Sequence, residues 1–280
     1  MAGDPWDTPE WHYIRREAML VRQLIGTGAT AIGRASYANL LGEYYTAFFS
    51  LSVGLERLAK LILVADHAIT NNGAMPSQRA LRDYGHKLPK LLSEAGKVAT
   101  NQSLKLRYVR PSTIISGKIV DCLDRFADAS KGRYANFAAL GDPNLGSDEP
   151  IRRWWEEVAK LILEEHYYGS PAQEKIEGRA RILDAALSSV SFVLYFNESG
   201  DQMQDIKTAS TRTGQTEIVQ RYGRYHALTI VRWLSEILSK LSELACYKHK
   251  LDAFYGVWEY FETYTVEDEF LKTRRRWPLH

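Results

Sequence analysis

The feature that most constrains this fold is an apolar stripe with a helical period between residues 36 and 71. Its members are spaced alternately four and three residues apart, which turns them toward one side of a helix. Such a helix buries its apolar side by packing against other helices, so the stripe favours a helical bundle. The stripe consists of Tyr44, Phe48, Leu51, Leu55, Leu58, Ile62 and Ala65.

The same helical period recurs along most of the chain. Pro9 predicts the start of a first helix that runs to about Gly26. The stretches 131–150 and 198–215 are rich in polar and turn-forming residues and are expected to be loops, and 189–196 fits a helix end or a strand equally. Two short helices are expected after Pro76 and after Gly85, and longer ones over 113–130 and 150–168. A further helix is expected to begin at a capping box over 170–173, and the last long helix is expected over about 216–250.

The composition is ordinary for a globular protein. The 280 residues carry 36 basic and 34 acidic side chains, so any nucleic-acid site has to be a local patch. The chain lacks the strand–helix alternation of a doubly wound nucleotide-binding fold. We therefore expect a single all-α domain over 1–280, built as a helical bundle with long antiparallel helices.

The two cysteines, Cys122 and Cys246, lie among apolar residues of expected helices, without paired Cys or His spacing. This argues against a metal site and is typical of a reducing compartment, so we expect a cytoplasmic protein without cofactors. The longest uncharged runs, 44–55 and 185–197, fall short of the roughly 18 residues that suggest a membrane span. The acidic N-terminus does not have the pattern of a signal peptide, and no membrane association is expected.

Three segments resemble the HEPN superfamily of small helical bundles. FFSLSVGLERLAKLILVADHA (48–68) is similar to the family's long helix with its Glu/Arg–Lys stretch, and YGHKLPKLLSEAG (84–96) is similar to its Gly-His-x-Leu segment. GRYANFAAL (132–140) resembles an Arg-Tyr segment that follows the third helix in many members. The best-matched core covers 36–140, and the last long helix over about 216–250 would complete it.

The resemblance implies a dimer and membership of a bacterial toxin–antitoxin, abortive-infection or antiphage system. Active members are metal-independent ribonucleases whose signature is Arg, four to six residues, then His, near the start of the last long helix. Arg221 and His226 have that spacing and that place. Because of this spacing and place, we hypothesise that Arg221 and His226 are catalytic. The sequence departs from the family pattern at Tyr222, the residue after the arginine, where the family often has Asn, His or Asp.

The chemistry of this pair suits RNA cleavage without a metal. A histidine can accept the 2′-hydroxyl proton or protonate the leaving oxygen, and an arginine can hold the scissile phosphate. Tyr222 and Tyr225 are candidates for stacking on unpaired bases, and Arg224 is a candidate phosphate ligand.

A second candidate RNA contact lies in the expected loop 131–150. Arg133, Tyr134 and Asn136 combine a cation, an aromatic ring and an amide, which are residue types that often serve binding in loops. The structural alternative is that the aromatic residues anchor the loop and the arginine binds the carbonyls at a helix end.

Helix geometry places a condition on the catalytic pair. Five residues of regular helix rotate by about 140°, so Arg221 and His226 would not share a face. They converge only if the helix begins near Gly223, with Arg221 in the preceding turn. Otherwise the stretch is a structural helix surface with Tyr222 and Tyr225 packed inward.

Two other groups of charged residues, within 121–128 and 156–166, are more simply explained as exposed helix surfaces than as functional sites. Asp121, Asp124 and Asp128 are spaced to share one helical face and could bind magnesium, but a solvated acidic face is the favoured interpretation. The stretch EEVAKLILEEH (156–166) places Glu165 and His166 on a helix, where we expect an exposed charged rim with ion pairs.

The sequence thus favours a HEPN-like metal-independent endoribonuclease of a bacterial toxin or antiphage defence system. Its expected partners are RNA, a second copy of the chain, and an antitoxin or other defence-system protein. The alternative is a non-catalytic dimeric scaffold or partner-binding subunit, which the 7 Trp and 16 Tyr would also suit. A magnesium-dependent enzyme built on the aspartate face is the third hypothesis.

Overall fold

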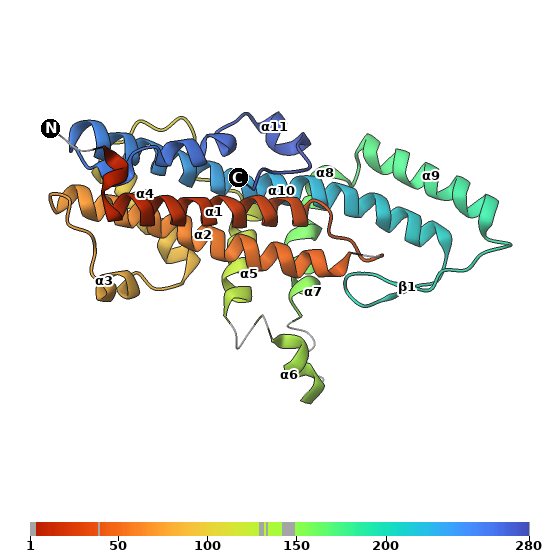
Figure 1. The fold of residues 1–280 in the computed structure, drawn as a ribbon. Coiled ribbons are helices and arrows are strands. Elements are labelled where there is room, and N and C mark those ends of the chain that lie inside the picture. The colour runs from red at the N-terminus through yellow and green to blue at the C-terminus, as the bar shows by residue number, and fades with distance from the viewer. Residues whose placement is uncertain (1–3, 39, 129–131, 133, 142–148, 280) are drawn as a thin grey trace. The chain divides into compact units, whose positions relative to one another are not determined.

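The computed structural model describes residues 4–38, 40–128, 132, 134–141 and 149–279, and this part of the chain is mostly helical (Figure 1). The expected all-α class is confirmed, in that most of the described residues are helical and few are in strands. The chain divides into two compact units. Unit 1 comprises Met1–Gly28, Ser50–Ser112 and Ala227–His280, and unit 2 comprises Ala29–Phe49 and Thr113–His226.

Three long helices contribute residues to both units. They are α1 (Pro9–Ile32), α2 (Leu41–Thr70) and α10 (Ile206–Glu243). The chain therefore passes from one unit to the other within regular helix, and the single domain over 1–280 stays a prediction. Across the ranges described, none of the helices has the length and apolar character needed to cross a bilayer.

Unit 1 confirms the expected apolar stripe. Leu55, Leu58 and Ile62 of α2 are fully buried, as are Leu234 and Leu241 of α10. Its remaining elements are η1 (Pro5–Asp7), α3 (Gln78–Asp83), α4 (Leu88–Asn101), η5 (Leu244–Lys248), η6 (Asp252–Phe254), η7 (Val257–Tyr260), η8 (Glu262–Tyr264) and α11 (Asp268–Thr273).

The first helix does not end at Gly26 as predicted but continues to Ile32. The glycines that suggested a helix end are packing positions. A Cβ atom on Gly28 would lie 2.7 Å from Leu51 Cγ, so the missing side chain lets α1 approach α2 closely.

Unit 2 is built around one broken helix and the first half of α10. The segments α7 (Pro150–Trp154) and α8 (Lys160–His166) are joined by a π-helical turn, η4 (Trp155–Ala159), a feature found often at functional sites. The other elements are α5 (Ile114–Ala127), α6 (Ala135–Gly141), α9 (Pro171–Leu187), β1 (Tyr195–Phe196) and β2 (Gln202–Met203).

The predicted loop over 131–150 is wrong in part, because α6 lies within it; residues 129–131, 133 and 142–148 lie outside the described part. The predicted start of α9 is confirmed, with Pro171 at its first turn. Its capping box is not formed. Ser170 Oγ donates to the carbonyl of Tyr167 at 2.7 Å, and Gln173 Oε1 accepts from the Gly169 amide at 2.8 Å.

The prediction of an irregular loop over 198–215 is wrong. Strands β1 and β2 pair as an antiparallel hairpin between α9 and α10 (Figure 1). Asn197 Oδ1 accepts hydrogen bonds from the amides of Ser199 and Asp201, both at 2.9 Å, which closes the turn. Asp205 then caps α10 by accepting from the Thr208 amide at 2.6 Å. The polar residues that indicated a loop are turn and cap residues, and α10 begins about ten residues earlier than predicted.

A buried ion pair fixes this hairpin inside unit 2. The side chain of Glu198, in the hairpin turn, has no exposed surface, and Arg212 Nε donates to its Oε2 at 2.8 Å. Its Oε1 accepts from Tyr44 Oη at 3.3 Å and from Thr216 Oγ1 at 3.2 Å. The Arg212 guanidinium lies 3.6 Å from the Trp155 ring centre. The buried carboxylate therefore has a guanidinium on one oxygen and two hydroxyl donors on the other, which offsets the cost of burying its charge.

Replacing Glu198 by alanine should lower the free energy of unfolding by about 3–5 kcal/mol, because the largely buried Arg212 guanidinium would lose its counter-charge. Urea denaturation monitored by circular dichroism measures the change. The matched control is Glu243→Ala, which removes an exposed pair with Lys240 (Nζ–Oε2 3.1 Å) and should cost less than about 1 kcal/mol. Equal losses in the two variants would contradict the structural role of Glu198.

Candidate functional site

The strongest candidate site in unit 2 is a group of side chains from α8 and α10, here called the histidine cluster: Glu165, His166, Arg221, Tyr222 and His226. The His166 and Tyr222 rings stack at 3.5 Å between centres and 12° between planes. The His226 ring centre lies 6.5 Å from that of His166. The Arg221 guanidinium carbon is 5.5 Å from the Tyr222 ring centre. Two imidazoles, one carboxylate and one guanidinium thus share one site.

The local sequence explains how α10 reaches this position. Gly223 faces Trp154 of α7, and a Cβ atom at 223 would lie only 2.9 Å from Trp154 Cζ2. The Trp154 ring is fully buried and has no room to move. Gly223 therefore serves as a close-contact residue inside a continuous helix, and not as the helix start.

This continuity decides the geometry of the predicted pair. Residues Arg221 and His226 both lie inside α10, so their side chains leave the helix about 140° apart. Arg221 is exposed, whereas His226 is only 6% exposed. The two residues are linked through Tyr222 and His166 of the same cluster, and their catalytic roles stay a prediction.

The sequence analysis did not choose Glu165 and His166 of α8 as site residues, because it predicted an exposed charged rim with ion pairs over 156–166. The predicted ion pairs are confirmed for Glu157, which pairs with Lys118 at 3.2 Å and with Arg153 at 3.7 Å. The predicted exposed position is wrong for His166, whose side chain is 21% exposed and stacked on Tyr222. The Glu165 side chain is 58% exposed. His166 Nε2 lies 3.4 Å from Glu165 Oε1. Only the adjacency of Glu165 and His166 in the sequence could have indicated them.

The remaining predicted residues on α10 pack within unit 2. The Arg224 side chain is buried against Gly33, which directly follows α1, and a Cβ atom on Gly33 would meet Arg224 Nη1. The Tyr225 ring meets His226 edge-on at 5.0 Å. Arg224 is 3% exposed, so it does not offer its guanidinium to a phosphate in solvent as predicted.

The predicted RNA-binding residues Arg133, Tyr134 and Asn136 are not part of the histidine cluster. Arg133 lies outside the described residues. Tyr134 is exposed beside α6, and Asn136 Nδ2 donates to Tyr45 Oη of α2 at 2.5 Å. Burial, together with the Tyr45 hydrogen bond to Glu149 at 2.6 Å, raises the pKa of Tyr45 well above its usual value. Asn136 is thus held by a protonated tyrosine.

The aspartate face does not form as predicted. The helix α5 ends at Ala127, and Asp128 has an extended backbone, so it does not continue the face of Asp121 and Asp124. Within the described ranges, Glu165, His166 and His226 are the three donors whose ligand atoms converge. Neither cysteine is a candidate nucleophile, because burial raises the pKa of Cys122 and of Cys246 to about 12.

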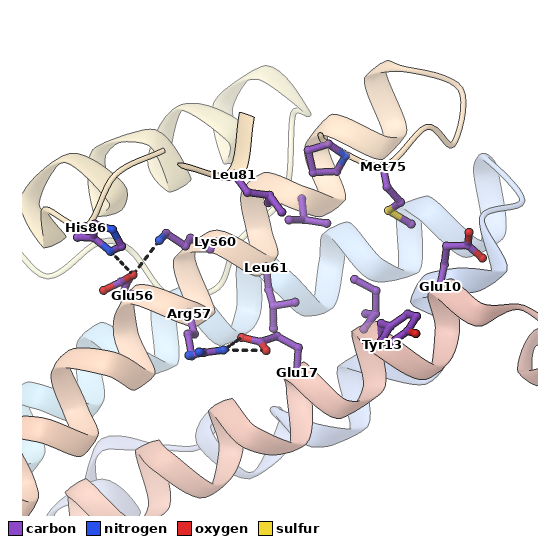
Figure 2. Close-up of a pocket in the computed structure, with 13 residues that line it drawn as sticks. Glu10, Tyr13, Glu17, Glu56, Arg57, Lys60, Leu61, Met75, Leu81 and His86 are labelled. Carbon is purple, nitrogen blue, oxygen red and sulfur yellow. Dashed lines mark hydrogen bonds and ion pairs between the residues drawn. The ribbon is translucent and has the colours of Figure 1, made fainter. Parts of the chain in front are cut away.

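A second candidate site is a pocket of about 620 Å³ in unit 1, which is a typical size for a small-molecule site (Figure 2). It has apolar walls and a charged rim. It is lined by Glu10, Tyr13, Ile14, Glu17, Glu56, Arg57, Lys60, Leu61, Val64, Met75, Pro76, Leu81 and His86.

The rim of this pocket is held by two groups of ion pairs (Figure 2). Glu17 binds Arg57 Nη1 through both carboxylate oxygens, at 2.6 and 2.8 Å. Glu56 Oε1 accepts from Lys60 Nζ at 2.7 Å and lies 2.8 Å from His86 Nδ1. Two of the segments that resemble HEPN proteins therefore meet here. Because the rim cations are paired with carboxylates, the pocket suits an amphipathic small molecule better than a phosphate chain.

Comparisons with protein-family models, curated proteins and solved structures found no match to this chain. The HEPN resemblance therefore rests on its three short segments.

Replacing Gly223 by alanine should destabilise the protein by about 1–3 kcal/mol, because the added methyl group would overlap the buried Trp154 ring. The matched control is Gly178→Ala in α9, where a Cβ atom meets none of the described residues within 4 Å. That change should stabilise the protein by about 0.5–1 kcal/mol, through helix propensity alone. Chemical denaturation of both variants checks the opposite signs. Stabilisation by both would show that α10 does not pack closely on Trp154.

Proposed function

We propose that this chain is a metal-independent endoribonuclease that works at the histidine cluster. The observation that supports this most is the unbroken contact series from Arg221 through Tyr222 and His166 to His226. It combines a guanidinium that can bind phosphate with two imidazoles that can exchange protons near neutral pH. The assignment to a bacterial toxin or antiphage system rests on the HEPN resemblance.

The proposed reaction is transfer of the phosphate within RNA. A base removes the 2′-hydroxyl proton, and the 2′-oxygen attacks the adjacent phosphorus. A 2′,3′-cyclic phosphate forms as the bond to the 5′-oxygen breaks, and an acid protonates that leaving oxygen. The two imidazoles provide one base and one acid, so the step is balanced without a metal or a cofactor.

Exposure distinguishes the two imidazoles. His166 is the better placed to exchange a proton with RNA, because it is half-buried whereas His226 is buried. Tyr222 already stacks on His166, so its proposed role is to hold that ring and not to stack on a base. Arg221, which is exposed, is the proposed ligand of the scissile phosphate.

The wild-type protein should cleave labelled RNA in EDTA and leave 2′,3′-cyclic phosphate ends. His166→Gln and Arg221→Ala should each lower the rate by roughly a hundredfold or more, the size of effect expected for a proton-transfer residue or an oxyanion ligand. His226→Gln tests the second imidazole. Rates are measured by gel electrophoresis of a labelled oligonucleotide, beside a substrate with deoxyribose at every position, which should not be cleaved.

The control for these variants is His249→Gln, an exposed histidine in unit 1, which should keep the wild-type rate. Melting temperatures of all variants are compared, because His226 is buried. Cleavage that persists in His166→Gln and in Arg221→Ala would reject the histidine cluster as the active site. Cleavage of the all-deoxyribose substrate would reject the proposed chemistry.

A second candidate function, a dimeric scaffold without catalysis, is favoured by an exposed apolar surface on unit 2. Ile182, Val190, Phe192 and Leu194, at the end of α9 and in the segment before β1, are each at least 68% exposed. Several large apolar side chains exposed within one short segment often mark an interface. We propose a second copy of the chain as its partner, because one self-complementary surface is enough to form a closed dimer.

The wild-type protein should therefore be a dimer in analytical ultracentrifugation, and Phe192→Asp should shift it to the monomer by placing a charge in the apolar contact. The matched control is Val109→Asp in unit 1, where an isolated valine is 82% exposed; this variant should remain dimeric. A monomeric wild-type protein, or a dimeric Phe192→Asp variant, would reject this interface.

A further inference from the structure

We infer that Glu165, His166 and His226 bind one divalent transition-metal ion, with Zn²⁺ as the best fit. Each residue offers one ligand atom, and these atoms all lie within 4.8 Å of one another. A carboxylate from α8 and an imidazole from each of α8 and α10 make up the donor set. Two imidazoles with one carboxylate are a typical ligand set for zinc, with the fourth position left to water.

The distances require only a small adjustment. Zinc–nitrogen and zinc–oxygen bonds of about 2.0–2.2 Å place tetrahedral ligand atoms roughly 3.4 Å apart. The Glu165 side chain is 58% exposed, so it can turn toward the imidazoles at little cost. The two imidazoles are held in place by aromatic contacts, with Tyr222 stacked on His166 and Tyr225 edge-on to His226. Their orientation is thus set before an ion arrives.

The donor types also select the metal. Neutral imidazoles favour Zn²⁺, Co²⁺ and Ni²⁺, whereas Mg²⁺ and Ca²⁺ prefer sites made of oxygen ligands. A partly exposed carboxylate and a partly exposed imidazole give an ion access from solvent. Sequence spacing alone does not reveal the site, because His226 follows His166 by sixty residues and the two meet only through packing.

Metal binding has a consequence that rests on the proposed function. An imidazole whose nitrogen coordinates zinc does not exchange a proton at that atom. If the histidine cluster cleaves RNA by proton transfer, Zn²⁺ should inhibit cleavage and EDTA should restore it. The binding inference itself does not depend on any activity.

The test is calorimetric titration of the tag-free, full-length protein with Zn²⁺, Co²⁺ and Mg²⁺. We expect one Zn²⁺ per chain, visible absorption bands of tetrahedral Co²⁺, and no measurable binding of Mg²⁺. Glu165→Gln and His166→Gln should each weaken Zn²⁺ binding at least about tenfold, while the control His249→Gln keeps the wild-type affinity. The Glu165 side chain is largely exposed, so its variant should fold like the wild-type protein.

Affinity for Zn²⁺ that is unchanged in both Glu165→Gln and His166→Gln would overturn the inference, as would the absence of one-to-one binding. Zinc binding with the expected losses, in a protein that cleaves no RNA, would support the metal site and reject the ribonuclease. RNA cleavage by a protein that does not bind zinc would reject the metal site and support the ribonuclease.

Discussion

The Glu198–Arg212 ion pair is the interaction on which the arrangement of unit 2 depends. A fully buried carboxylate is tolerated only when charged and polar partners surround it, and here those partners come from different elements. Arg212 and Thr216 belong to α10, and Tyr44 belongs to α2. The pair therefore fixes the hairpin turn and the early part of α10 together. Because α10 is one continuous helix, this also fixes the direction in which the residues from Arg221 to His226 point.

The two units offer sites of different chemistry. Unit 1 holds an apolar pocket whose rim charges are already paired, at the place where two of the HEPN-like segments meet. Unit 2 holds the histidine cluster, whose imidazoles are suited to proton transfer. The resemblance and the proposed chemistry thus fall mainly on different units, connected through the continuous α10. The pocket and the histidine cluster therefore share no lining residue.

The histidine cluster can serve two kinds of chemistry that exclude each other at the same nitrogen atoms. In the proposed ribonuclease, His166 and His226 would carry protons, and the nearby Arg221 would provide positive charge for a phosphate. In the inferred metal site, the same imidazoles and Glu165 would be ligands. The metal concentration around the protein would then decide which chemistry operates, without any change of fold.

The sequence by itself determined the helical class and the buried stripe on α2, because helical periodicity is a local property of the chain. It did not give the start of α10, because Asn197 and Asp205 use their polar side chains for a turn and a cap, a pattern that also suits a loop. It placed Arg221 and His226 correctly on the last long helix but set His166 aside. Only tertiary packing decided that α8 brings His166 and Glu165 to His226, because the stacking on Tyr222 and the close approach at Gly223 join segments that are far apart in the sequence.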